Sequence, residues 1–206
     1  DLPAGPSEVM VVADDAADPA FVAADLLSQA EHDPVAQVML VAISEAFVQS
    51  VETELERQLA DLPRAETARA AIANSRALLV GDLGEGVEVA NAYAAEHLII
   101  QTADPRGFAA FVRHAGSIFL GPWTPEAAGD YAAGPNHALP TAGAARAHGG
   151  VTVEMCQKTT TMIEFDAESA SNLAETVERL ATLEGLDAHR VAMALRRERA
   201  DALKRK

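Results

Sequence analysis

The chain has 206 residues, of which 49% are hydrophobic and only 4% aromatic, and its formal net charge is −15. This apolar content is enough to build a core, which excludes intrinsic disorder and a collagen-like structure. The excess of acidic side chains would repel nucleic-acid phosphates and anionic lipid surfaces, so neither is an expected partner.

The cysteine content and the apolar runs indicate the compartment. The single cysteine, Cys156, cannot form a disulfide within the chain, and no apolar run is long enough to cross a bilayer. The chain begins with Asp1 and lacks the basic and apolar layout of a signal peptide. We therefore expect a soluble, cytoplasmic protein, and we expect the sequence to be part of a longer polypeptide.

Short apolar runs alternate with amphipathic stretches in the first 120 residues. Asp18 and Pro19 form a helix start, with Asp18 as N-cap, and Pro34 ends that helix because it disfavours helical backbone in the residue before it. The alternation predicts an α/β fold with a parallel sheet and helices on both faces, as in an incomplete Rossmann-like domain. The predicted strands cover residues 8–13, 37–43, 76–80, 98–101 and 117–120, and the predicted helices cover 19–32, 44–62, 64–75, 82–96 and 104–115.

The composition changes after residue 120. Residues 121–150 are rich in Gly, Pro, Asn, His and Ala, with one predicted helix over 124–133 that is capped by Thr124 and started by Pro125. After an extended stretch over 159–165, helices are predicted over 166–184 and from Asp187, as N-cap, to about 204. We therefore expect a Rossmann-like portion over 1–150 and a small helical unit over 151–206.

Two local patterns are compatible with a metal ion. Gln29 and His32 share a helix face at a spacing that suits two ligands of one ion, and His189 lies in the first turn of a helix, where the neutral imidazole is favoured. Each pattern is equally compatible with ordinary surface side chains.

Two other patterns are compatible with catalysis. The adjacent Glu96 and His97 could share acid/base work, although a buried, hydrogen-bonded histidine explains the pair as well. The loop over 129–141 combines an acid, an amide and an imidazole among turn-forming residues, which indicates a site. The glycines of 81–86 do not have the GxGxxG spacing of a dinucleotide-binding loop.

Seven segments together resemble the second half of the histidinol dehydrogenase family. They are 3–8 (PAGPSE), 25–32 (DLLSQAEH), 95–98 (AEHL), 116–121 (GSIFLG), 129–131 (GDY), 136–141 (NHALPT) and 184–189 (EGLDAH). The match spans nearly the whole chain.

The resemblance implies a set of site residues. It assigns zinc, replaceable by manganese or cobalt, to Gln29, His32, Asp130 and His189, and acid/base catalysis to Glu96 and His97. It also implies that the substrate is bound by Ser7, Gln29, His32, His97, Asp130, Glu184 and His189. The residues that contact NAD would lie upstream of residue 1.

The resemblance also implies the reaction and the partner. L-histidinol would be oxidised through histidinal to L-histidine, the last step of histidine biosynthesis, with NAD as hydride acceptor. The protein would be a homodimer in which Glu184 and His189 complete the partner's site, and the chain alone would be inactive. Because residues 144–165 depart from the family pattern, a related dehydrogenase for another small polar alcohol is the alternative. A metal-binding dimerisation module without activity is a third hypothesis.

Overall fold

The computed structural model describes residues 5–204, so the first two residues of the PAGPSE segment lie outside the described residues. The chain divides into two compact units, residues 1–156 and 157–206. Each unit is described by itself below.

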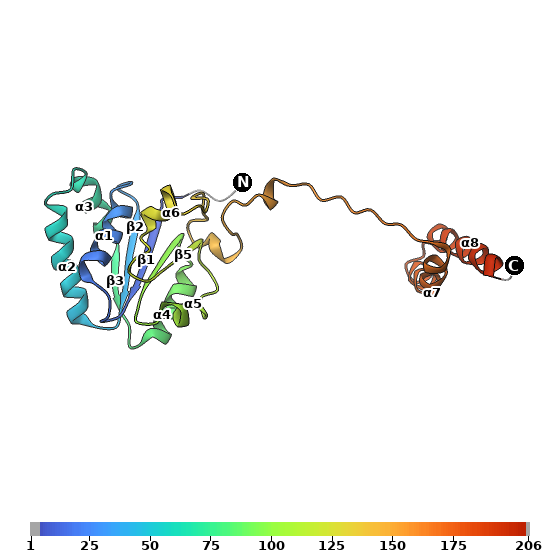
Figure 1. Ribbon diagram of the computed structural model, residues 1–206, viewed down its shortest axis with the longest axis horizontal. Helices are drawn as coiled ribbons and strands as arrows, with labels where there is room; N and C mark the ends of the chain where they lie inside the picture. Colours follow the sequence, from blue (N-terminus) through green and yellow to red (C-terminus); the bar gives the residue numbers. More distant parts are fainter. Residues whose placement is uncertain (1–4, 205–206) are drawn as a thin grey trace. The chain divides into compact units, whose positions relative to one another are not determined.

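The first unit is built on a five-stranded sheet in which every pair of neighbouring strands is parallel (Figure 1). The order β3-β2-β1-β4-β5 places β1 at the centre, and all six of its residues are buried, as expected for a strand covered on both faces. The predicted parallel sheet is confirmed. The strands are β1 (Glu8–Ala13), β2 (Gln37–Ala42), β3 (Arg76–Leu79), β4 (His97–Gln101) and β5 (Ser117–Leu120).

Helices cover both faces of this sheet, and alternate side chains of β1 contribute to two apolar layers. Val9 and Val11 pack with α1 (Pro19–Ala30), α2 (Glu45–Leu59) and α3 (Ala65–Ala73). Met10 and Val12 pack on the other face, with α4 (Leu83–Tyr93) and α5 (Pro105–Ala109). The same alternation in β4 puts Ile99 on the face of the sheet that α1 covers. His97 and Gln101, two positions before and after Ile99, lie on the same face. The short helix α6 (Glu126–Tyr131) packs against α1.

The predicted helices of the first unit are all shorter than expected, and the ends of α4 and α5 have a visible cause. Helix α4 ends at Tyr93 because Ala94 adopts the left-handed conformation, with φ 59°. Helix α5 ends at Ala109, and the buried side chain of Asn91 holds the turn that follows: it donates to the Phe111 carbonyl and accepts from the Arg113 amide. The end of α5 therefore depends on a contact from another element, the Asn91 side chain of α4.

Two predicted helix caps are also wrong. Thr124 does not cap α6, since its hydroxyl donates to the Leu120 carbonyl and Pro125 occupies the N-cap position. Asp187 is the first helical residue of α8 and not its N-cap, because the His189 amide hydrogen-bonds to the Leu186 carbonyl. The Asp187 carboxylate instead binds Arg190, at 2.6 Å.

The second unit is a helical hairpin of α7 (Ala167–Leu183) and α8 (Asp187–Lys204). Asp166 caps α7 through the Ser169 amide, and Gly185 makes the turn with φ 73°. Glu178 and Arg197 connect the two helices at 3.0 Å. Single turns of 3-10 helix lie in the first unit at Ala144–Arg146 and Glu154–Cys156. Among the described residues, no helix is long and apolar enough to cross a membrane.

Candidate active site

Buried polar residues gather at the amino ends of β1 and β4. Glu8 opens β1, and Glu96 and His97 open β4; these three residues are 4–5% exposed. Ligand sites in open parallel sheets usually form at the carboxyl ends of the strands, so this site lies at the opposite edge. Sheet topology alone would not have located it.

Glu8 joins the two catalytic candidates through its main chain. Its amide donates to Glu96 Oε2 at 3.0 Å, and its carbonyl lies 3.2 Å from His97 Nδ1. Since a carbonyl can only accept, Nδ1 carries the hydrogen and Nε2 keeps its lone pair. The Nε2 atom is buried and has no hydrogen-bond partner among the residues that the structure describes. A buried imidazole with a free lone pair can act as a base.

Helix α6 contributes two carboxyl groups to the same ring. Glu126 Oε1 lies 3.8 Å from His97 Nδ1, and Asp130 Oδ1 lies 3.8 Å from Nε2. Asp130 is partly exposed, whereas Glu126 is only 2% exposed and its Oε2 has no partner. Carboxyl groups of α6 and of the neighbouring Glu96, whose Oε2 lies 3.7 Å from Nδ1, thus surround the His97 ring.

The crowding and burial of these groups change their pKa values. Burial raises the pKa of Glu96 to about 7, with smaller opposing effects from the Glu8 amide and carboxylate. Burial, followed by the charge of Asp130, raises the pKa of Glu126 to about 9. Burial lowers the pKa of His97. A neutral imidazole and a carboxyl that titrates near pH 7 are suited to accept protons.

The predicted metal ligands of the first unit lie on elements that surround His97. Gln29 is 1% exposed on α1, and its Oε1 has no hydrogen-bond partner in the described part of the chain. His32 follows the end of α1 and is close enough for its charge to lower the pKa of His97, and Asp130 contacts the ring from α6. A buried, unpaired amide oxygen is costly without a ligand, so these residues fit a cation.

This donor set includes only one imidazole and one carboxylate from the first unit. Over the part of the chain that the structure describes, no three His, Cys, Asp or Glu side chains gather closely enough to hold a metal ion. Within the first unit, the predicted zinc site therefore depends on the amide oxygen of Gln29 in addition to His32 and Asp130. The C-terminal end of α1, beside His32, adds a partial negative charge that favours a cation.

The remaining predicted substrate residues belong to different parts of the chain. Ser7 precedes β1, and its side chain lies close enough to the Glu96 carboxyl to lower the pKa of that group slightly. Glu184 is the C-cap of α7 and His189 lies in the first turn of α8, and both are exposed in the second unit. Their role in the site of the first unit stays a prediction.

Sequence reasoning missed two acidic residues of this region, Glu126 and Asp25. Asp25 is 7% exposed on α1, accepts from Gln101 Nε2 at 2.7 Å, and has its pKa raised by burial to about 6. Its position one turn before Gln29, on the apolar face of α1, is a signal that could have shown it. Glu126 gave no such signal, since an acid in the first turn of a helix is common at the surface.

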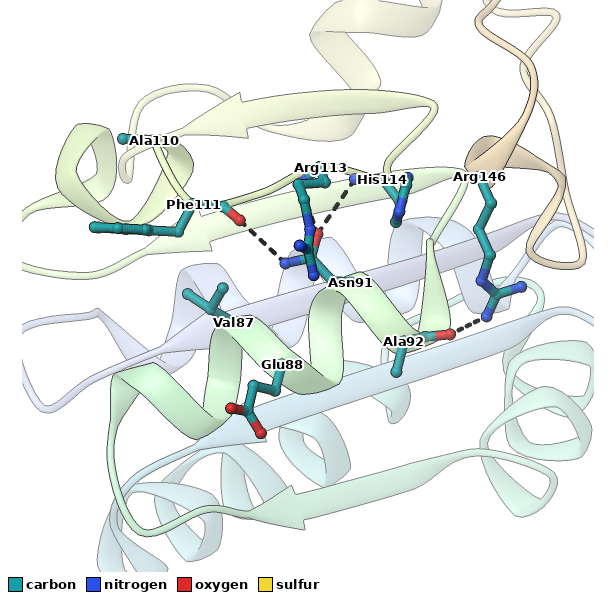
Figure 2. A pocket seen from close by; sticks show the side chains of 9 residues that line it. All are labelled: Val87, Glu88, Asn91, Ala92, Ala110, Phe111, Arg113, His114 and Arg146. Carbon is teal, nitrogen blue, oxygen red and sulfur yellow. Dashed lines mark hydrogen bonds between the residues drawn. The ribbon is translucent and has the colours of Figure 1, made fainter.

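A hollow of about 730 Å³ lies on the α4 face of the sheet, away from α1 (Figure 2). It is lined by Val87, Glu88, Asn91, Ala92, Ala110, Phe111, Arg113, His114 and Arg146. Asn91 there braces the chain after α5, and the Arg146 guanidinium donates to the Ala92 carbonyl. None of the predicted site residues lines this hollow.

The start of α4 does not fit a dinucleotide. The Gly81 amide donates to Glu85 Oε2 at 2.6 Å, and the Glu85 amide donates to Asp82 Oδ1 at 2.9 Å. Carboxylates therefore occupy the amides that a phosphate would need, and their charge would repel it. The structure agrees with the absence of a GxGxxG spacing.

The parallel sheet with helices on both faces and the buried Glu-His pair define an α/β protein with a candidate acid/base site. The sequence profile of a family described as histidinol dehydrogenase matches residues 1–197. The chain belongs to this family, as the sequence motifs predicted.

Individual relatives agree with the family match. The histidinol dehydrogenases of Xanthomonas campestris pv. campestris (strain 8004) and Xylella fastidiosa (strain 9a5c) are 52% and 53% identical to the chain over 196 and 199 residues. Each alignment covers 95% of this chain and 46% of the relative. The crystal structure of histidinol dehydrogenase from Elizabethkingia anophelis matches with a TM-score of 0.95 and 40% identity, over 98% of this chain and 46% of that one. The chain therefore spans about half the length of these relatives.

Proposed function

We propose that this chain carries the acid/base and metal-binding part of an NAD-dependent zinc dehydrogenase that oxidises L-histidinol to L-histidine in histidine biosynthesis. The observation that carries the proposal is the buried Nε2 of His97, which has no hydrogen-bond partner within residues 5–204 while Nδ1 faces the Glu8 carbonyl. Family membership supplies the substrate class, and the geometry supplies the base.

The Nε2 atom of His97 would accept the proton of the substrate hydroxyl, while a hydride leaves the carbon that bears this hydroxyl. The imidazolium that forms would keep its Nδ1 hydrogen on the Glu8 carbonyl, and the Asp130 carboxylate, 3.8 Å from Nε2, would stabilise it. Glu96, with its pKa near 7, would then take a proton from the water that hydrates histidinal. Each of the two protons thus has an acceptor within the site.

The two cofactors enter this proposal differently. Gln29, His32 and Asp130, with His189, would hold zinc, manganese or cobalt, which supplies a fixed positive charge that orients the substrate nitrogens. NAD is the hydride acceptor that the family implies, and we propose that its contacts lie upstream of residue 1. We also propose a cytoplasmic homodimer in which Glu184 and His189 act in the partner's site, and we expect the chain alone to be inactive.

The number of NADH molecules formed per substrate molecule tests the function. In the enzyme that contains this chain, L-histidinol should yield two NADH and one histidine, because two successive oxidations occur. Formation of one NADH with release of an aldehyde would favour a dehydrogenase for another small polar alcohol. Metal binding without NADH formation would favour the dimerisation module.

A further inference from the structure

One hydrogen bond joins the helix that leads to the candidate metal ligands to the strand that carries the candidate base. Gln101 Nε2 on β4 donates to Asp25 Oδ2 on α1 at 2.7 Å, and these residues are 2% and 7% exposed. Over the part of the chain that the structure describes, it is the only side-chain hydrogen bond between α1 and a strand. Neither residue has a role in the site described above.

The periodicity of helix and strand places this bond in the same layer as the candidate site. Asp25 precedes Gln29 by one helical turn, so their side chains share a face of α1. Gln101 follows His97 by four positions in β4, so their side chains lie on the same face of the sheet. Gln29 and His97 are themselves 1% and 4% exposed. The bond and the site therefore lie in one buried layer, between α1 and the sheet.

Distances along the two elements relate the bond to the site. Because β1 is parallel to both β2 and β4, α1, which connects β1 to β2, runs opposite to β4. From Asp25 to His32 the chain advances about 10 Å toward the amino edge of the sheet. From Gln101 back to His97, β4 covers about 13 Å in the same direction. His32 and His97 thus reach the same edge from one fixed point.

The other contacts of this layer are less exacting. Val22, Leu26 and Ile99 belong to the apolar cluster of this face, and the burial of apolar surface has no preferred direction. A hydrogen bond requires a particular length and angle, so a shift of α1 along the sheet would break it. A buried polar pair also adds little net stability compared with apolar side chains of the same shape. These properties suit the bond to fixing register rather than to adding stability.

We propose that Asp25 and Gln101 are positioning residues: their hydrogen bond fixes α1 along β4 and so holds the metal candidates of α1 and its end beside the base. This inference rests on the proposed function, because it takes Gln29 and His32 as metal ligands. The bond acts through its geometry, so it requires an acceptor at residue 25 and a donor at residue 101, or the reverse.

Zinc affinity of the metal-free enzyme that contains this chain, measured by isothermal titration with zinc chloride, tests the bond. Gln101→Met removes the donor at nearly constant length and should weaken zinc binding by roughly 10- to 100-fold, the range for residues that support a ligand. Asp25→Asn keeps an acceptor and should bind zinc like the wild type. Gln101→Glu opposes two carboxyl groups and should weaken binding. Adding Asp25→Asn to it restores a donor and an acceptor and should recover most of the loss.

A matched control separates positioning from stability. Val41 is fully buried on the other face of the sheet, so Val41→Ala should lower the free energy of unfolding, measured with urea, without changing zinc affinity. Gln101→Met should lose zinc affinity under conditions in which both variants are folded. If Gln101→Met does not fold, Gln101→Glu with and without Asp25→Asn still decides.

Three results would overturn the proposal. Wild-type zinc affinity in a folded Gln101→Met variant would leave the bond a role in stability alone. A loss in Asp25→Asn but none in Gln101→Met would mean that the charge of the carboxylate, and not the bond, attracts the cation. The third is a folded exchanged pair that recovers no affinity.

Gln29→Ala distinguishes these failures from a failure of the proposed function. If Gln29→Ala binds zinc as tightly as the wild type, the metal assignment is wrong and the positioning of this ligand fails with it. If Gln29→Ala loses affinity while Gln101→Met does not, the metal assignment stands and only the role of the Asp25–Gln101 bond is refuted.

Discussion

The Nδ1 atom of His97 and the main-chain oxygen of Glu8 lie 3.2 Å apart in the interior of the first unit. Because the partner is a peptide carbonyl, no side-chain substitution at residue 8 removes it, and the orientation of the ring depends on the path of β1. The catalytic candidate is thus tied to the central strand of the sheet, which is a rigid support for a group that must be placed accurately.

The two histidines His97 and His114 provide a matched pair of substitutions. In the active enzyme that contains this chain, His97→Asn should lower kcat by roughly 10²- to 10⁴-fold, the usual effect of losing a positioned base. His114→Asn, in the hollow on the α4 face, should leave turnover unchanged. Steady-state kinetics with L-histidinol would check both, and a normal kcat in His97→Asn would return Glu96 and His97 to a structural role.

Glu126 should make stability depend on pH. Its pKa rises from an ordinary 4.5 to about 9 in the folded chain, so between these values the folded state binds one more proton than the unfolded state. Stability from this group therefore falls as the pH rises through that window, by up to about 1.4 kcal/mol per pH unit.

Thermal unfolding of Glu126→Gln tests this directly. The variant should gain Tm relative to the wild type as the pH is raised from 5 to 8, because a neutral amide avoids the ionisation of the unfolded carboxyl. Glu52→Gln, at an exposed position on α2, should show the same Tm difference at both pH values. A pH-independent difference for Glu126→Gln would mean that the buried carboxyl is ionised.

Gly116 should tolerate no side chain. A Cβ at this position would meet the Glu96 carbonyl at 2.6 Å and Pro140 Cδ at 3.2 Å, so Gly116→Ala forces the start of β4 or the loop to move. We expect a loss of about 1–3 kcal/mol in the free energy of unfolding, measured with urea. Gly149→Ala is the control, since a Cβ there has nothing within 4 Å, and equal losses in the two variants would contradict the close packing.

Much of the fold follows from the sequence because the strands are continuous apolar runs and the helices have periodic apolar faces. β1 and α1 begin where predicted, and Asp18 caps α1 through the Ala20 amide. The ends of α4 and α5 did not follow, because the left-handed backbone of Ala94 ends α4 and the Asn91 side chain holds the turn after α5. Local propensity carries little information on such features.

The site was less accessible to sequence reasoning than the fold. The catalytic and metal candidates came from a family resemblance, because their local spacing fitted surface residues equally well. The roles of Glu8 and Glu126 emerged only from the structure. Glu8 contacts Glu96 and His97, which lie 88 and 89 positions further along the chain. Glu126 reaches the site because α6 packs beside α1. No spacing within one element could have shown these contacts.

Zinc binding should depend on the three first-unit ligands. We expect a large loss of zinc affinity in each of three variants, Gln29→Ala, His32→Asn and Asp130→Asn. Each loss should exceed the roughly 10- to 100-fold that follows when a residue that only supports a ligand is mutated. His114→Asn should bind zinc like the wild type. Isothermal titration with zinc chloride at neutral pH would measure all four, and wild-type affinity in Asp130→Asn would remove that carboxylate from the site.

The central claim is that the polar region at the amino ends of β1 and β4 is a metal-assisted acid/base site. A zinc-soaked crystal of the chain, with anomalous data collected at the zinc absorption edge, tests it most directly. We predict one ion at about 2.0–2.2 Å from Gln29 Oε1, a His32 ring nitrogen and an Asp130 carboxylate oxygen, with His97 beside it and not bound. An ion located elsewhere, or Asp130 turned away from an ion at this position, would contradict the account.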